Sequence, residues 1–435
     1  MCSVRTCPTK WNFRSRDDDN GWVQRIVGGI RVRRGVVIAW VIVVITGMTM
    51  AASPRTAADD RPPPLYADER TSLRTVSRTW FADDVCLPSA AAPDLTRLFD
   101  SEPANIIGAD YQRATQIDED TTLWTFQDAE VRIPGGGSRV VHNVGAVQEG
   151  NCFTFLMSGG RTDPQPWLYA EHTASQFRWF WPLGAAMGSD ERLYVYLAEM
   201  NELGEEYLTH VVPSGTYVAA IDTTTWDVEW YGQPANGGAD LYGFAIESDQ
   251  HWTYLFAQCH RQFGYDPVLF VFGHDRTCAD RVHIARVPRG QLLSPPAYWD
   301  GTRWQSSPTR AATIIETAGR LANPTQFIRH HNQWMAITKL DDWWGQRVIV
   351  ERALHPAGPY QFYDERWPAV KCADDCNHYF ASWIPTDTPS TLTFGLSHNR
   401  WDGVASWVYR PTFHTINAPG WQPTAASRCQ LGQCD

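Results

Sequence analysis

Positive charge is scarce in this 435-residue chain, and almost none of it comes from lysine. Lys10, Lys339 and Lys371 are its only lysines, and 37 Lys and Arg residues stand against 48 Asp and Glu, which gives a formal net charge of −11. Nucleic-acid-binding proteins carry basic patches, so this balance excludes nucleic acid as an expected partner. The lysine shortage alone carries no functional meaning, because arginine supplies the remaining positive charge.

Several catalytic signatures are also missing from the sequence. It has no glycine-rich phosphate loop, no Gly-x-Ser-x-Gly nucleophile turn and no His-Glu-x-x-His helix motif, which excludes kinases, esterases and zinc proteases of those types. Its charged fraction of 20% and hydrophobic fraction of 43% exclude a mainly disordered chain or a coiled coil. The length allows a large buried core, and all-β barrels and propellers reach such sizes as one domain.

One long apolar run is present near the start of the sequence. Val36–Ala52 follows a cluster of three arginines within residues 31–34. A basic segment, an apolar core and small residues at Thr49 and Ala51 are typical of an export signal. The run of about 17 residues also reaches the short limit of a membrane span. The pattern leaves open a signal cleaved after Ala51 or a retained single-span anchor, and either predicts an extracytoplasmic location for the rest of the chain.

Composition shifts divide the sequence into four expected regions. Residues 1–52 form a basic cytoplasmic segment with the signal or anchor, and residues 53–95 are a tether rich in Pro and Ala. Residues 96–420 have the alternating pattern of short strands, and residues 421–435 form a cysteine-containing tail.

Ten cysteines agree with an oxidising compartment, since eight of them follow the apolar run. We predict local disulfides between neighbouring cysteines, which leaves one longer pair: Cys259–Cys278, Cys372–Cys376, Cys429–Cys434 and Cys86–Cys152. A zinc site is the alternative, but the closely spaced pairs lack a second matching pair with nearby histidines. We therefore expect neither a metal nor a cofactor.

Five segments of similar pattern recur along the strand-rich region. They are residues 121–131, 191–200, 251–259, 332–340 and 390–398. Each follows a turn and an earlier strand-like run, so the repeating unit is three or four antiparallel strands. Such units cannot bury both faces alone, and stacking them radially solves this problem. The repeats predict an all-β fold, a five-bladed β-propeller, with a pair of β-sandwiches as the alternative.

This fold accounts for part of the excess of 21 tryptophans. Trp124, Trp252 and Trp334 lie on or beside the second strand of a repeat, where neighbouring blades press together. We expect these rings to form core rather than to contact a ligand.

Two acidic residues of the first repeat are candidate catalytic groups. Asp110 lies on the entering strand, and Asp128 lies at the end of its hairpin partner. Antiparallel pairing returns the end of the second strand beside the start of the first. A carboxyl pair about 5 to 9 Å apart is what glycoside hydrolysis requires, with one group as acid and the other as nucleophile or base. The alternative is structural: Asp128 caps a turn and Asp110 binds backbone amides.

The stretch that contains both aspartates, residues 108–128, resembles the opening motif of the secreted actinobacterial endo-D-arabinanases. Their motif is Gly-x-Asp, a hairpin, then Leu-Trp-x-Phe-Gly-Asp, and weaker similarities follow at residues 142–147, 180–185 and 378–383. The resemblance covers roughly residues 99–415. It implies a five-bladed propeller that cleaves furanosidic D-arabinan of mycobacterial-type cell walls with the aspartates that match Asp110 and Asp128.

The chain departs from that family at two places. Gln127 replaces the glycine before the second aspartate, and Trp383 stands where the late Tyr-x-x-x-His-Pro motif has histidine. These changes alter linkage preference or mark a member without catalysis, but they leave both carboxyl groups in place.

Further candidates surround this pair. Glu199 falls one position from the place of Asp128 in its own repeat and could tune the pKa values of the other acids. Asn143 could bind a sugar hydroxyl or serve as a satisfied core residue. Trp343, Trp344 and Trp383 are candidates for a rim on which sugar rings stack, and a solvated loop is the alternative for the first two.

The sequence thus supports two hypotheses. The first is an exported, monomeric glycoside hydrolase that acts on cell-wall arabinan, and the second is a non-catalytic carbohydrate-binding propeller. Carboxyl groups that face an open groove favour the enzyme, whereas acids buried under hydrogen bonds favour the binding protein.

Overall fold

The computed structural model describes residues 79–81, 84–170, 178–202, 211–235, 240–259, 264–266, 271–273, 281–316, 324–341, 345–367, 376–385, 390–401 and 407–417. The chain divides into two compact units, residues 1–60 and 61–435, and every described residue belongs to the second. No helix among the described residues is long and apolar enough to cross a membrane. The apolar run Val36–Ala52 and its export role lie outside the described residues.

The described residues form almost entirely antiparallel sheets, five of which have four to six strands. The first has the order β1 (Trp80–Phe81), β9 (Cys152–Met157), β8 (Val144–Glu149), β5 (Thr121–Phe126), β4 (Arg113–Gln116), with β2 (Val85–Cys86) beside β9. The second runs β10 (Arg178–Met187), β11 (Leu193–Glu202), β12 (Val211–Ile221), β13 (Val228–Gly232).

The other three large sheets follow along the chain. The third runs β14 (Asp240–Ser248), β15 (Trp252–Cys259), β18 (Arg281–Pro288), β19 (Ala297–Trp299), β20 (Trp304–Gln305), with β21 (Ile315–Glu316) beside β18. The fourth runs β22 (Gln326–His330), β23 (Gln333–Lys339), β24 (Val348–Ala353), β25 (Gln361–Arg366). The fifth runs β26 (Cys376–Ile384), β27 (Thr391–Trp401), β28 (Trp407–Tyr409), with β29 (Thr412–Asn417) beside β27.

Two small sheets and three short helical turns complete the described elements. The sheets are β3 (Ile106–Ala109), β6 (Ala129–Arg132), β7 (Ser138–Val141), and β16 (Gly264–Asp266), β17 (Val271–Gly273). The helical turns are α1 (Ala92–Leu95), η2 (Pro103–Asn105) and η5 (Pro308–Arg310).

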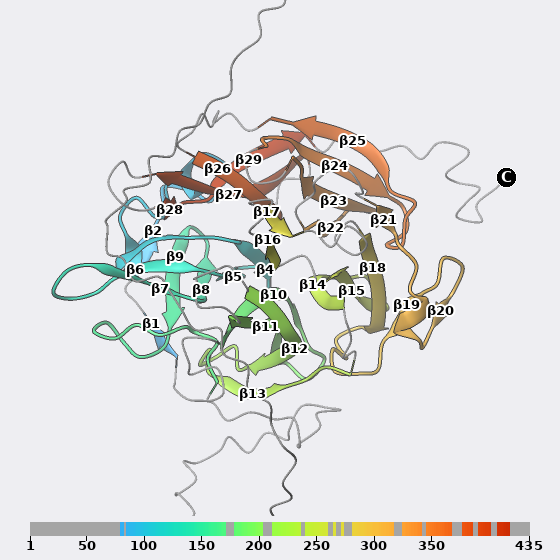
Figure 1. Ribbon diagram of the computed structural model, residues 1–435, viewed down its shortest axis with the longest axis horizontal. Coiled ribbons are helices and arrows are strands. Elements are labelled where there is room, and N and C mark those ends of the chain that lie inside the picture. The colour runs from blue at the N-terminus through green and yellow to red at the C-terminus, as the bar shows by residue number, and fades with distance from the viewer. Residues whose placement is uncertain are drawn as a thin grey trace, which may run out of the picture. The chain divides into compact units, whose positions relative to one another are not determined.

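In each large sheet the strand nearest the common centre is termed the first strand: β4, β10, β14, β22 and β26. These first strands form a closed ring. In chain order β4 contacts β10, β10 contacts β14, β14 contacts β22, β22 contacts β26, and β26 returns to β4. Figure 1 shows the five sheets arranged around this common centre. The arrangement is that of a β-propeller. The nearly all-β prediction is therefore confirmed, and the five recurring segments identified in the sequence overlap the second strands β5, β11, β15, β23 and β27.

Aromatic side chains fill the spaces between the sheets, as the repeats predict. Trp124 is fully buried on β5, and Trp334 on β23 is 3% exposed and packs edge-on against Tyr254. Trp252 is partly buried and packs beside the same cluster as Trp334. Removing a buried tryptophan side chain typically costs about 3–5 kcal/mol of stability, so these rings hold the sheets together.

The first strands of three sheets carry a register shift near their middle. The shifts fall between Pro182 and Ala185 in β10, between Tyr242 and Ala245 in β14, and between Tyr379 and Ala381 in β26. Such bulges re-aim side chains. The β14 bulge contains Gly243 and Phe244. Gly243 has a φ of 92°, and a Cβ there would lie 2.2 Å from the ring of Tyr196, so only glycine fits.

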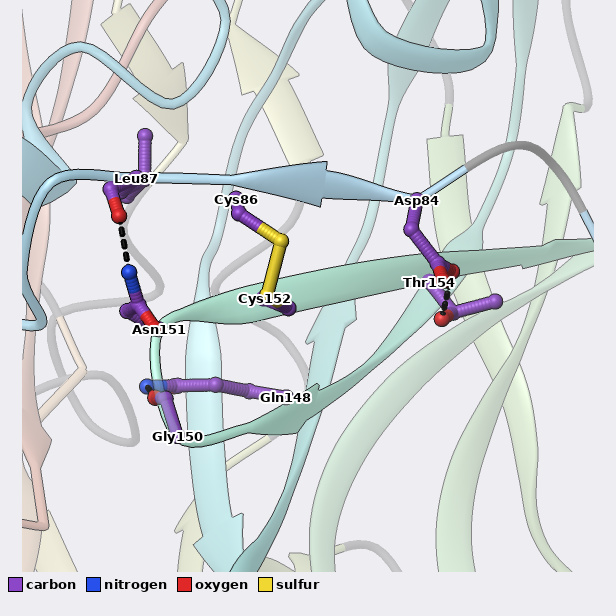
Figure 2. Close-up of a disulfide and its surroundings, with 8 residues drawn as sticks. All are labelled: Asp84, Cys86, Leu87, Gln148, Gly150, Asn151, Cys152 and Thr154. Atoms are coloured by element: carbon purple, nitrogen blue, oxygen red, sulfur yellow. Dashed lines mark hydrogen bonds between the residues drawn. A yellow bond between two sulfur atoms is a disulfide. The ribbon is translucent and has the colours of Figure 1, made fainter.

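One predicted disulfide ties the start of the described chain to the first sheet. Cys86 on β2 and Cys152 on β9 are register partners and are bonded to each other, as Figure 2 shows. Hydrogen bonds on either side of it, Asn151 to Leu87 and Thr154 to Asp84, hold the same two strands together. Cys376 is also disulfide-bonded. Of the other predicted pairs, Cys278, Cys372, Cys429 and Cys434 lie outside the described residues.

Candidate active site

The two candidate aspartates lie side by side, as the hairpin predicts. Asp110 occupies the link between β3 and β4, and Asp128 occupies the link between β5 and β6. The Asp110 N–H donates to the Asp128 carbonyl at 2.9 Å, and the Gln127 N–H donates to the Asp110 carbonyl at 2.9 Å. The ladder between the two links therefore fixes both residues where β4 starts, beside the centre of the ring.

Asp110 is held by hydrogen bonds to both carboxyl oxygens. Its Oδ1 accepts the Asp128 N–H at 2.9 Å, and its Oδ2 accepts the hydroxyl of Tyr379 at 2.6 Å. Burial, followed by the charge of Asp128, raises the pKa of Asp110 well above its usual range. The two hydrogen bonds and the charge of Arg113 act in the opposite direction but do not reverse that shift. Asp110 therefore retains its proton more readily than an ordinary aspartic acid does.

Asp128 presents a different arrangement. Its Oδ1 lies 3.0 Å from Nδ1 of His142 and accepts the indole N–H of Trp181 at 2.9 Å. Its Oδ2 accepts no hydrogen bond from the described residues and is open to solvent, within a side chain that is 12% exposed. One oxygen of Asp128 is thus anchored, and the other is available to a bound molecule.

Aromatic side chains form a wall beside Asp128. The imidazole of His142 stacks on Trp179 with ring centroids 4.1 Å apart, and Trp179 contacts Trp181 edge-on. Trp179 and Trp181 both belong to β10, so the first strand of the second sheet supplies this wall. Such surroundings lower the local dielectric and strengthen the interaction between the two carboxyl groups.

The site formed by Asp110, Asp128, His142, Trp181 and Tyr379 is the mouth of the ring, and Arg113 lies next to it at the start of β4. Its guanidinium lies over the rings of Phe380 and Phe244, 4.4 and 5.0 Å from their centroids, and it donates to the Tyr111 carbonyl at 3.1 Å. Burial lowers the pKa of Arg113 to about 9, and the charge of Asp110 opposes this. The bulges in β14 and β26 lie at these phenylalanines and bring them together.

A cavity of about 680 Å³ lies toward the other ends of the first strands. It is lined by residues of β4, β10, β14 and β22 and by the end of β26. Six charged residues line it, whereas Asp110 and Asp128 do not: Arg113, Asp118, Glu119, Glu247, Arg289 and Arg329. Glu247 lies near the end of β14 and is only partly exposed, and its burial raises its pKa to about 8.

The other expected site residues lie elsewhere. Asn143 is fully buried, and its side-chain amide binds the backbone of Leu168 and Phe180, so it braces the chain instead of facing a sugar. Trp383 is 4% exposed, packs in the core, and donates its indole N–H to the Met335 carbonyl at 3.2 Å, so it is not an exposed rim residue.

The remaining predictions differ in outcome. Glu199 is buried on β11, and its charge acts on Tyr217; it is not among the groups that shift the pKa of Asp110. Gln127 is 2% exposed, and its side chain donates to the Pro182 carbonyl. Trp343 and Trp344 lie outside the described residues.

Three residues that complete the mouth were not selected from the sequence. Tyr379 lies at the register shift of β26, and Trp181 lies just before that of β10. Alignment of the first strands across the repeats would therefore have placed them near the paired aspartates. His142 follows β7, a strand of the small sheet that departs from the repeat pattern. Among the described residues, no group of three or more His, Cys, Asp or Glu could hold a metal ion.

Comparison of the sequence with known families gives one match. The family described as "Domain of unknown function (DUF5005)" matches residues 94–374, well over half of the chain. The chain belongs to this family. The matched region of the DUF5005 family includes both aspartates but ends before β26, which supplies Tyr379. No curated protein sequence matches the chain.

One solved structure shares the fold of this DUF5005 member, and two others are similar to it at lower TM-scores. A "putative hydrolase" from Bacteroides ovatus ATCC 8483 has a TM-score of 0.55 at 16% identity, covering 74% of this chain and 89% of that one. An exo-β-1,3-galactanase from Phanerochaete chrysosporium has a TM-score of 0.42 at 11% identity, covering 77% and 64%. A GH62 α-L-arabinofuranosidase domain from Coprinopsis cinerea has a TM-score of 0.39 at 9% identity, covering 78% and 96%. The first likeness shows a common fold.

Proposed function

We propose that this protein is an exported glycoside hydrolase that cleaves internal arabinofuranosidic linkages in cell-wall D-arabinan, such as arabinogalactan and lipoarabinomannan. In this proposal the five large sheets are the five blades of a propeller, and Asp110 and Asp128 are the catalytic pair at its mouth. Cell-wall polysaccharide is the partner, and the protein works as a monomer.

One observation carries the proposal: the two neighbouring carboxyl groups differ in their surroundings. Asp110 is enclosed, and its pKa is raised well above the usual range, whereas Asp128 keeps an oxygen open to solvent. Hydrolysis of a glycosidic bond needs a protonated acid beside a second carboxylate, and paired groups in unlike environments meet that need. Asp110 is then the proton donor, and Asp128 belongs to the half of the site that accepts a proton.

The substrate class rests on the motif in residues 108–128 that resembles the endo-D-arabinanases. The fold shared with the Bacteroides ovatus protein is compatible with this class and does not select it. The disulfide between Cys86 and Cys152 is compatible with an oxidising, extracytoplasmic location.

A carbohydrate-binding propeller without catalysis is the second candidate, and one observation favours it. Asp110 and Asp128 are only 7% and 8% exposed, and both accept hydrogen bonds from neighbouring residues. Carboxyl groups in a purely structural role would show the same burial. The open Oδ2 of Asp128 is the feature that such a role does not need.

The test is release of soluble oligosaccharides from purified arabinogalactan and lipoarabinomannan by the full chain, followed by chromatography. The wild-type protein is expected to release products of several lengths, and Asp128→Asn to release almost none. Asp118→Asn, in an exposed turn after β4, is the matched control and should behave as wild type. Bound but intact glycan would favour the binding protein, and equal rates for wild type and Asp128→Asn would overturn the catalytic assignment.

A further inference from the structure

The geometry points to His142 as the general base of this site, with Asp128 acting through it. The inference rests on the proposed function, which it deepens by adding a catalytic residue to the carboxyl pair. His142 begins one of the weaker similarities to the endo-D-arabinanases, residues 142–147, but the sequence assigns it no role, and the role inferred here comes from its contacts.

The contact between His142 and Asp128 fixes the position of one imidazole nitrogen, Nδ1. Nδ1 lies 3.0 Å from Oδ1 of Asp128, and the side chain of His142 is 21% exposed. An ionised carboxylate can only accept, so Nδ1 carries the hydrogen of this bond. The lone pair of the imidazole then lies on Nε2, which has no partner among the described residues and is accessible to solvent. A nitrogen in that state is ready to accept a proton.

The surrounding side chains hold this arrangement in place. Trp179 stacks on the imidazole with planes 16° apart, which restricts rotation of the ring. The Trp181 indole N–H donates to the same Oδ1 of Asp128 that contacts Nδ1 of His142, and this second bond restricts rotation of the carboxylate. A base oriented by a fixed carboxylate is a recurring arrangement in enzymes that activate a weak nucleophile.

The charged groups around the imidazole agree with this role. Asp128 is the ionisable side chain in direct contact with His142, and Asp110 lies next to Asp128. From β10, Trp179 stacks on the ring and Trp181 packs edge-on against Trp179; neither is charged. The carboxylate of Asp128 therefore stabilises the imidazolium that forms when Nε2 takes a proton.

The step balances with water as the second reactant. The water oxygen forms a bond to the anomeric carbon while one of its protons passes to Nε2 of His142. The bond between that carbon and the leaving oxygen breaks, and the leaving oxygen takes the proton of Asp110. His142 then returns its proton, and Asp110 regains one, by exchange with solvent, so one water is consumed per linkage.

The variant His142→Asn separates proton transfer from positioning. The asparagine amide can still donate to Asp128 but has no counterpart of Nε2. We expect kcat for arabinan cleavage to fall by about 100-fold or more with KM little changed, and the acidic limb of the pH–rate profile to disappear. His251→Asn, in the exposed turn between β14 and β15, is the matched control and should keep wild-type kinetics. Retained activity with an unchanged pH profile in His142→Asn would overturn the inference while leaving the proposed function standing.

A second measurement does not depend on activity. Nitrogen NMR of the full chain with labelled histidine, assigned by the signal lost in His142→Asn, reports which ring nitrogen is protonated. We expect the tautomer with hydrogen on Nδ1, and loss of that preference in Asp128→Asn. The opposite tautomer would overturn the inference whatever the activity. Absence of products from the wild-type protein, with the expected tautomer observed, would instead contradict only the proposed function.

Discussion

The two ends of the inner strands differ in kind. At the starting ends, Asp110 and Asp128 lie nearly buried beside aromatic rings, and Oδ2 of Asp128 is the carboxyl oxygen that stays open to solvent. Toward the far ends lies the 680 Å³ cavity, which Glu247 and Arg329 line. The cavity has the volume expected of a ligand site, but the paired carboxyl groups of Asp110 and Asp128 lie outside it, at the mouth. The comparison teaches that volume alone does not locate the chemistry, because acid–base catalysis needs paired groups in unlike surroundings.

The largest expected difference between the two ends is in catalysis. Asp128→Asn should lower the rate of arabinan cleavage by about 100-fold or more, because it removes the carboxylate of the proton-accepting half. Glu247→Gln, the corresponding change in the cavity, should leave the rate near that of wild type. Steady-state rates of both variants on purified arabinogalactan check this, and a reversed order of the two would move the active site to the cavity.

A smaller effect is expected at Tyr379, which donates to Asp110 at 2.6 Å. This hydrogen bond lowers the pKa of Asp110 against the raising effect of burial, so Tyr379→Phe should raise that pKa further. Since Asp110 donates its proton, activity is lost as pH rises through its pKa, and the variant should keep activity to higher pH than wild type. Tyr254→Phe removes a comparable Tyr–Asp hydrogen bond far from the mouth and should leave the pH–rate profile unchanged. An identical shift in both variants would refute the role of Tyr379.

The smallest effect concerns stability and belongs to the cavity. Burial raises the pKa of Glu247 in the folded state to about 8 from its ordinary value of 4.5. The folded state therefore binds this proton more tightly than the unfolded state, and the resulting stability is present below pH about 4.5 and is lost as pH rises toward about 8. Glu247→Gln should reduce that loss, so the difference in Tm between variant and wild type should grow across this range. A difference that stays constant with pH would count against the buried state of Glu247.

The fold was largely accessible from the sequence, because hairpin spacing is a local property. The five segments of similar pattern fall on second strands, and the turn residues around residue 118 mark the hairpin that brings Asp110 and Asp128 together. Trp124 and Trp334 are buried where the repeats place them. The Cys86–Cys152 pair also followed from the sequence, by elimination of the shorter pairs.

The detail of the site depends on contacts between distant segments, which spacing does not reveal. Tyr379 meets Asp110 across a sequence separation of 269 residues, because the fifth sheet closes the ring on the first. Trp181 reaches Asp128 from the neighbouring sheet. Trp383 was a candidate for the rim, but every residue of β26 is buried, and Trp383 packs in the core beside the cavity that it also lines. Glu199 sits in the repeat position near that of Asp128 yet faces Tyr217.

The most direct test of the account is the location of bound sugar. A crystal structure of the Asp128→Asn variant of the full chain with an arabinofuranosyl oligosaccharide would show it. We predict a furanose ring at the mouth, against Trp181, with its glycosidic oxygen near Asp110 and the position of Asp128. An oligosaccharide bound instead in the cavity beside Glu247 and Arg329 would contradict the central claim that the paired aspartates are the active site.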